Sequence, residues 1–123
     1  MQILVVDDQR VFSLLVAAWL RKLRGVRVEL AASAHEALSL METMTPDLVI
    51  TDLHMPGMDG FELTRKVKEK APAPVVILMT SAEPPQFRER GHAAGADYCV
   101  EKDNLQSRLL EFFQKRLGPS LQA

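Results

Sequence analysis

The stretch Ile3-Leu4-Val5-Val6-Asp7-Asp8 decides the fold, because four apolar residues in a row run directly into two aspartates. A continuous apolar run of this length is typical of a strand that is covered on both faces, as in a parallel sheet. The same arrangement returns at Leu48–Thr51, which ends at Asp52, and at Val75–Met79, which is followed by Thr80. Each of these predicted strands therefore carries a polar side chain at its carboxyl end.

Segments with helical periodicity alternate with these strands. Gly25 ends the first helix, whose apolar stripe is Phe12, Leu15, Val16, Trp19, Leu20 and Leu23. A second strand, Arg27–Leu30, alternates charged and apolar residues, which indicates an edge position with one wetter face. Ser33 and Glu36 have the spacing of a capping box and predict a second helix, with an apolar stripe of Ala34, Ala37, Leu38, Met41 and Met44.

The second half of the chain continues the alternation. Asp59 with Glu62 predicts the cap of a third helix that runs to about Lys70. A weak fourth helix starts near Pro84-Pro85, and a fifth strand spans Asp97–Glu101. The sequence thus contains five strand-like runs, each followed by a segment with helical character.

The last strand is followed by Lys102 and by a final helix. Asp103 and Gln106 predict the cap of this helix, whose apolar stripe is Leu105, Leu109, Phe112 and Phe113. Gly118-Pro119 predicts its end. We therefore expect one domain over residues 1–118, with residues 119–123 as a C-terminal tail or the stub of a linker.

Alternating strands and helices of these lengths predict an α/β fold with a parallel sheet between two layers of helices. We expect a flavodoxin-like (βα)5 architecture, which is a doubly wound, five-stranded parallel sheet in the order 2-1-3-4-5. This order places the most apolar strands next to the centre of the sheet. Ligands of such sheets bind at the carboxyl ends of the strands, where the strand order reverses.

Composition excludes several classes of protein. The chain has 123 residues, 47% of them hydrophobic, and 15 basic residues against 16 acidic ones, so it is neither disordered nor suited to nucleic acid. Its longest apolar run, Leu14–Leu20, is too short to span a membrane, and we expect no signal peptide, because Met1-Gln2 runs straight into an apolar strand without a basic flank. A single cysteine, Cys99, is consistent with a reducing compartment. We expect a cytoplasmic protein.

Polar residues gather at one edge of the predicted sheet. Asp7 and Asp8, Asp52, Thr80 and Lys102 each follow a different strand, so their side chains are expected to converge. Three crowded carboxylates repel one another unless a cation compensates, and oxygen ligands without His or Cys favour Mg²⁺. A carboxylate at such a site is able to attack a phosphoryl group. The residues alone leave all three aspartates open as the nucleophile.

This constellation resembles the receiver domain of two-component response regulators over nearly the whole chain. The resemblance rests on the pair Asp7-Asp8, on Asp52 in D-L-H-M-P-G-M-D-G, on Thr80 in L-M-T-S-A and on Lys102 in G-A-D-Y-C-V-E-K. It implies that Asp52 accepts a phosphoryl group from a histidine kinase or a phosphotransfer histidine. The protein is then a self-modifying phosphoacceptor, with autodephosphorylation, rather than a conventional enzyme.

The resemblance also assigns roles to the neighbouring residues. Asp8 and Asp52 would ligate Mg²⁺, with Asp7 acting largely through water and the backbone carbonyl of His54 completing the set. Thr80 would move toward the phosphoryl group, and Lys102 would pair with its oxygens. The fourth helix, the fifth strand and the last helix would form the face that contacts a downstream protein.

Two positions depart from the family pattern. The residue after the strand-five lysine is commonly a cis proline in the family, and here it is Asp103. The position three residues before that lysine often carries Tyr or Phe, and here it is Cys99, with Tyr98 expected on the opposite face of the strand. The usual aromatic switch is therefore absent, or Tyr98 replaces it.

A degenerate receiver, which docks proteins without phosphorylation, is the main alternative. A phosphatase-type fold with its nucleophile on strand one would need a spaced D-x-D, and a flavin carrier would be repelled by Asp7-Asp8. Because 123 residues leave no room for an output domain, we expect either a stand-alone receiver or a part of a longer chain, as a monomer or weak homodimer.

Overall fold

The computed structural model describes residues 1–117, so the predicted helix end at Gly118-Pro119 lies outside the described residues. The strands are β1 (Gln2–Val6), β2 (Arg27–Ala31), β3 (Leu48–Asp52), β4 (Val75–Thr80) and β5 (Tyr98–Glu101). The helices are α1 (Arg10–Leu20), α2 (Ala34–Leu40), α3 (Gly60–Lys68), α4 (Phe87–Ala94) and α5 (Leu105–Leu117), with a 3-10 turn at Lys102–Asn104.

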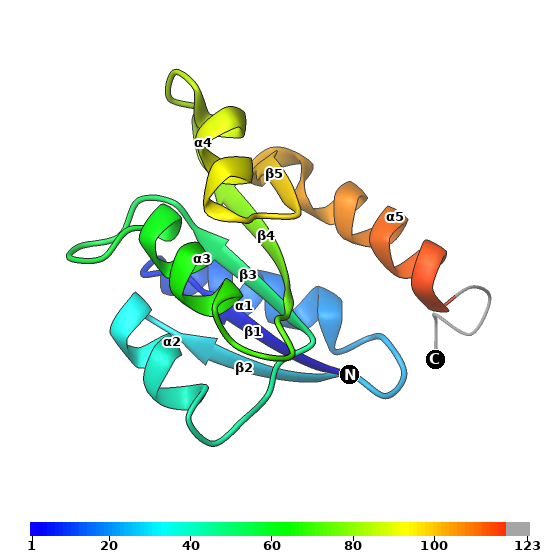
Figure 1. Cartoon of the computed structure of the whole chain (residues 1–123). Coiled ribbons are helices and arrows are strands. Elements are labelled where there is room, and N and C mark those ends of the chain that lie inside the picture. Colours follow the sequence, from blue (N-terminus) through cyan, green and yellow to red (C-terminus); the bar gives the residue numbers. More distant parts are fainter. Residues whose placement is uncertain (118–123) are drawn as a thin grey trace.

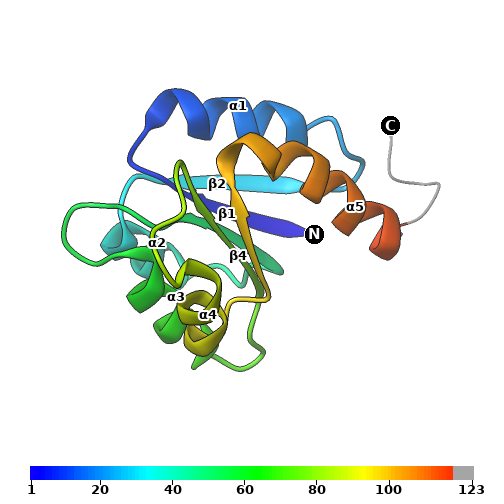
Figure 2. The same cartoon turned by 90° about the horizontal axis from the view of Figure 1, so that it is seen from above.

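All five strands are parallel and lie in the order β2-β1-β3-β4-β5, which confirms the predicted flavodoxin-like topology. α1 and α5 cover one face of the sheet, and α2, α3 and α4 cover the other (Figures 1 and 2). Since the strand order reverses between β1 and β3, the carboxyl ends of these two strands flank the expected ligand site.

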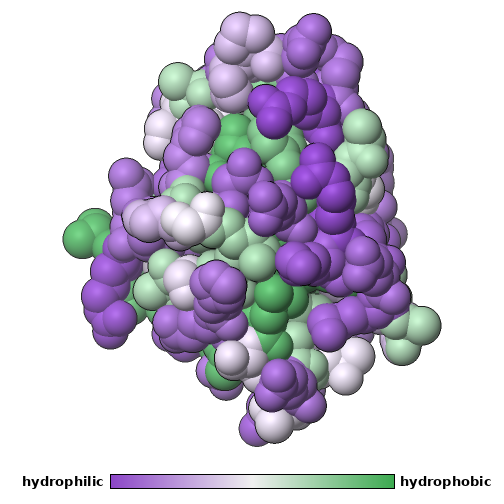
Figure 3. All heavy atoms as spheres, turned by 60° about the vertical axis from the view of Figure 1, so that its left-hand side comes forward, coloured by the Kyte–Doolittle hydropathy of each residue, from purple (hydrophilic) through white to green (hydrophobic). Residues whose placement is uncertain are grey.

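Alternate side chains of β1 enter two different cores. Leu4 and Val6 pack with the α2–α3–α4 layer, whereas Ile3 and Val5 pack with the α1–α5 layer. All four are fully buried, which is why this strand reads as a continuous apolar run rather than an alternating one. The face of the molecule drawn in Figure 3 is mostly hydrophilic, with small apolar areas between the hydrophilic side chains.

Two of the predicted helix caps are formed. The Ser33 hydroxyl accepts a hydrogen bond from the Glu36 amide at 3.1 Å, and the Asp59 carboxylate accepts one from the Glu62 amide at 2.9 Å. The predicted cap at Asp103 is wrong, because Asp103 lies inside the 3-10 turn that precedes α5. This turn moves the start of the helix to Leu105.

The boundaries of α1 also differ from the prediction. The helix ends at Leu20 rather than Leu23, because the chain turns toward Gly25, whose φ of +72° suits glycine. Leu15 belongs to the predicted stripe, yet it is 47% exposed. The buried apolar residues of the helix are Val16, Ala17 and Leu20, and the predicted stripe contains the first and last of these. No helix within residues 1–117 is long and apolar enough to cross a membrane.

Candidate functional site

Asp7, Asp8 and Asp52 meet at the carboxyl edge of the sheet. Asp52 is the last residue of β3, and Asp7 and Asp8 follow β1 directly. One carboxylate oxygen of each residue lies within 4.8 Å of the other two. Asp7 and Asp52 are buried, whereas Asp8 is exposed to solvent. The convergence predicted from the sequence is therefore present for all three aspartates.

Lys102 lies against this acidic cluster and is only 8% exposed. Its Nζ is 2.8 Å from Asp7 Oδ2 and 3.6 Å from Asp52 Oδ1, and it lies 4.6 Å from the centre of the Phe12 ring. The ammonium also donates a hydrogen bond to Gln9 Oε1 at 2.9 Å. Sequence reasoning missed Gln9, although its place directly after the aspartate pair is a signal that points to the site.

The site carries more negative than positive charge. Burial, followed by the nearby Asp7 carboxylate, raises the pKa of Asp52 from 3.8 to about 6, and Lys102 opposes this shift. Asp7 Oδ2 has the lysine beside it at 2.8 Å but accepts no hydrogen bond of good geometry. The site thus contains three carboxylates and only one ammonium. The excess of negative charge favours the binding of a further cation.

Thr80 and His54 lie at the same edge in different settings. Thr80 is fully buried, and its hydroxyl donates a hydrogen bond to the carbonyl of Ala82 in the β4–α4 loop at 3.0 Å. The His54 side chain is exposed in the loop after β3. Among residues 1–117, no hydrogen bond to the His54 carbonyl is formed. That carbonyl therefore has no competing partner within the described chain.

The Asp52→Asn variant is expected to be more stable than the wild-type protein at neutral pH when divalent cations are absent. Because the pKa of Asp52 is higher in the folded protein than in the unfolded chain, the folded state holds the proton longer, and stability falls as the pH rises from about 4 to about 6. Asparagine removes this penalty. Thermal unfolding in EDTA across this range should show a difference that grows with pH; a constant difference would contradict the expected burial effect.

The sequence pattern of the response regulator receiver domain matches residues 3–114. The chain belongs to the response regulator receiver domain family. It is 37% identical over 108 residues to the gliding motility regulatory protein of Myxococcus xanthus and 36% identical over 102 residues to the sensor protein EvgS of Escherichia coli. These matches cover 85% and 83% of this chain but only 14% and 8% of those proteins, so it corresponds to a small part of each.

Solved receiver domains share the whole fold of this one. The CheY-like receiver domain of Methanospirillum hungatei is 29% identical with a TM-score of 0.84, over 97% of this chain and 94% of that one. The chemotaxis protein CheY4 of Vibrio cholerae is 30% identical with a TM-score of 0.82, over 94% and 98% of the two chains. This receiver domain is thus a component of two-component signalling. Receiver domains generally bind Mg²⁺ at an acidic pocket, and this one has a matching aspartate cluster.

Proposed function

We propose that this receiver domain accepts a phosphoryl group on Asp52 from a phosphohistidine of a kinase or a phosphotransfer protein. The observation that carries the proposal is the setting of the buried Asp52 carboxylate, which lies within 4.8 Å of two other aspartates and 3.6 Å from the Lys102 ammonium. In a degenerate receiver that serves only for docking, there would be no need to keep this arrangement complete.

The residues present fit a magnesium ion. The donors are all oxygens, one from each of three carboxylates, and the carbonyl of His54 has no other partner in the described chain. In this proposal Asp8, Asp52 and the His54 carbonyl hold the ion, and Asp7 acts largely through water. When bound, Mg²⁺ supplies positive charge that draws an anionic phosphoryl group toward the carboxylates.

Asp52 is better placed than Asp7 to act as the nucleophile. Asp7 is already engaged, because its Oδ1 accepts the Gln9 amide at 2.9 Å and its Oδ2 lies 2.8 Å from Lys102. Asp52 has only the looser contact of 3.6 Å to the same lysine. In the transfer step, an Asp52 oxygen forms a bond to phosphorus while the bond between phosphorus and the donor's imidazole nitrogen breaks, and the imidazole takes up a proton.

Two further side chains act on the transferred group in this proposal. Lys102 pairs with the phosphoryl oxygens, since its ammonium already lies next to Asp52. The Thr80 hydroxyl leaves the Ala82 carbonyl and donates to the phosphoryl group instead, which carries the change into the β4–α4 loop.

Phosphorylation by acetyl phosphate tests the proposal and separates it from the docking-only alternative. The wild-type protein should gain one phosphoryl group in the presence of Mg²⁺, as read by intact mass, and almost none when EDTA removes the ion. A protein that stays unmodified in Mg²⁺, and that equally gains nothing from a panel of histidine kinases, would be the degenerate receiver.

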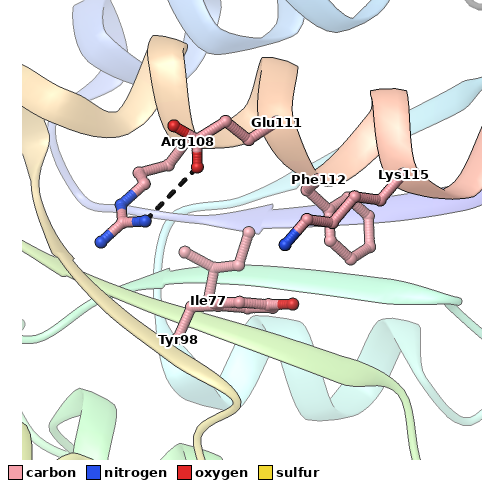
Figure 4. Close-up of a pocket in the computed structure, with 6 residues that line it drawn as sticks. All are labelled: Ile77, Tyr98, Arg108, Glu111, Phe112 and Lys115. Carbon is pink, nitrogen blue, oxygen red and sulfur yellow. Dashed lines mark hydrogen bonds and ion pairs between the residues drawn. The ribbon is translucent and has the colours of Figure 1, made fainter.

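We expect the output surface to be formed by α4, β5 and α5. α4 begins after Gln86, a non-glycine residue with a φ of 62°, and Arg88 ties the helix to β5 by a 2.8 Å hydrogen bond to the Cys99 carbonyl. On the other side of β5, Tyr98 packs edge-on against Phe112 beside a small pocket under α5 (Figure 4). Cys99 and Tyr98 thus lie on opposite faces, as predicted.

Hydrogen exchange tests this surface. Addition of beryllium fluoride with Mg²⁺, which mimics the phosphoryl group, is expected to change amide protection between Thr80 and Leu110, because the β4–α4 loop is linked to the site through Thr80. Protection in α2, which packs next to β2 at the opposite edge of the sheet from β5, serves as the internal control and should stay unchanged. Equal protection of the Thr80–Leu110 region in both states would overturn the assignment.

The remaining parts of the proposal concern context. We propose a cytoplasmic receiver over residues 1–118 that acts as a monomer or weak homodimer, with a protein as its downstream target. Its net charge of −1 gives no support to a nucleic-acid partner for this domain.

A further inference from the structure

Gln9 makes two connections within the acidic site. Its backbone amide donates to Asp7 Oδ1 at 2.9 Å, and its side-chain Oε1 accepts from Lys102 Nζ at 2.9 Å, across 93 positions of sequence. It is therefore the one uncharged side chain among residues 1–117 that is hydrogen-bonded to the lysine ammonium. The other polar partners of that ammonium are the carboxylates of Asp7 and Asp52.

The position of Gln9 in α1 is unusual for its residue type. Gln9 is the N-cap residue of α1, where Ser, Thr, Asp or Asn would accept a hydrogen bond from the first turn. Its side chain forms no cap hydrogen bond. The amide is turned toward Lys102 instead, so the first turn of the helix gives up a stabilising contact while the lysine gains an acceptor.

We propose that Gln9 is a positioning residue that orients the Lys102 ammonium for the phosphoryl group, an inference that rests on the proposed function. An ammonium has three N–H donors. Gln9 accepts one of them at 2.9 Å, while the Asp7 and Asp52 carboxylates lie 2.8 and 3.6 Å from the same nitrogen. The lysine is thereby ordered before a phosphoryl group arrives, without being committed to Asp52.

The lack of charge on Gln9 is part of this role. The site already contains three carboxylates within 4.8 Å of one another, and burial with Asp7 holds the pKa of Asp52 above its ordinary value. A fourth carboxylate at position 9 would also accept from Lys102, but it would add to the repulsion of an anionic phosphodonor. A neutral acceptor orients the lysine without this cost.

The variants Gln9→Met and Gln9→Ser test the inference, with Gln106→Met, at an exposed position of α5, as the matched control. Gln9→Met keeps the length of the side chain but removes the acceptor, and it should slow phosphorylation by acetyl phosphate in Mg²⁺ about tenfold, the size expected for one hydrogen bond to a charged group. Gln9→Ser should slow it equally while raising the thermal midpoint, since serine caps α1. Gln106→Met should change neither quantity.

A second readout does not depend on phosphorylation. In ¹H–¹⁵N spectra of the lysine ammonium groups, the Lys102 signal should be slowly exchanging in the wild-type protein and in Gln106→Met, and broadened or lost in Gln9→Met. If the wild type is phosphorylated but Gln9→Met matches it in rate and in this signal, the positioning role is refuted and the proposed function stands. If the wild type is never phosphorylated, the proposed function itself fails; an unchanged Lys102 signal in Gln9→Met would then refute the positioning role as well.

Discussion

Asp52→Asn is expected to abolish phosphoryl uptake from acetyl phosphate, because a carboxamide is a far poorer nucleophile than a carboxylate and retains the shape of the side chain. Intact mass after incubation in Mg²⁺ measures the effect, which should be complete within detection. Asp103→Asn is the matched control: it makes the same chemical change at an exposed carboxylate one residue from Lys102 and should leave uptake unchanged.

The loss of phosphoryl uptake in Asp52→Asn is not expected to result from unfolding of the variant. The buried carboxylate is ionised at neutral pH at a cost to the folded state, so its removal stabilises the protein without Mg²⁺. Uptake that persists in Asp52→Asn at wild-type stoichiometry would assign the nucleophile to Asp7 or Asp8 instead.

Gly60→Ala is expected to destabilise the protein by about 3 kcal/mol, a large value for one methyl group, because the first turn of α3 lies directly on the end of β3. A Cβ at Gly60 would clash with the backbone carbonyl oxygen of Asp52 and lie 2.9 Å from the backbone Cα of Leu53. Backbone atoms give way less easily than side-chain ends. Urea unfolding measures the loss, and the displaced Asp52 should also be phosphorylated more slowly.

Gly25→Ala provides the control for this prediction. Gly25 has a φ of +72° but nothing within 4 Å of an added Cβ, so alanine there costs only the backbone strain, about 1 kcal/mol. Equal losses of unfolding free energy in Gly60→Ala and Gly25→Ala would show that the close packing of Gly60 against Asp52 is not the cause of the destabilisation.

The fold was predictable because its strands carry unambiguous patterns. Leu48–Thr51 and Val75–Met79 read as buried parallel strands, and topology alone then brings their carboxyl ends to one edge. For the same reason the meeting of Asp7, Asp8, Asp52 and Lys102 required no knowledge of side-chain contacts. The prediction of Arg27–Leu30 as an edge strand is also confirmed, since charge on alternate residues marks a strand with one wetter face.

Features that depend on side-chain direction were not predictable. Leu15 belongs to an apolar pattern, but the pattern does not say which of two adjacent stripes contacts the sheet. Asp103 has cap spacing, yet a 3-10 turn intervenes. The place of Gln9 after the aspartate pair indicates that it lies near the site, but no local pattern shows that its side chain bonds to a lysine 93 positions away.

Cys99 stands where many members of the family have an aromatic residue, and its neighbour Gly91 in the structure explains this difference. A Cβ added at Gly91 of α4 would clash with Cys99 Sγ, so the helix packs directly on this position of β5. The small thiol and the glycine fit one another, and the pKa of the Cys99 thiol is raised by its burial. There is no room on this face for the aromatic side chain common in the family.

The position of the phosphoryl group along the chain tests the central claim most directly. After incubation with acetyl phosphate and Mg²⁺, borohydride reduces an aspartyl phosphate to homoserine, which fragment masses then locate in the sequence. The account predicts homoserine at position 52 alone, with none in EDTA. Homoserine at position 7 or 8, or no conversion in a protein that carries a phosphoryl group, would contradict it.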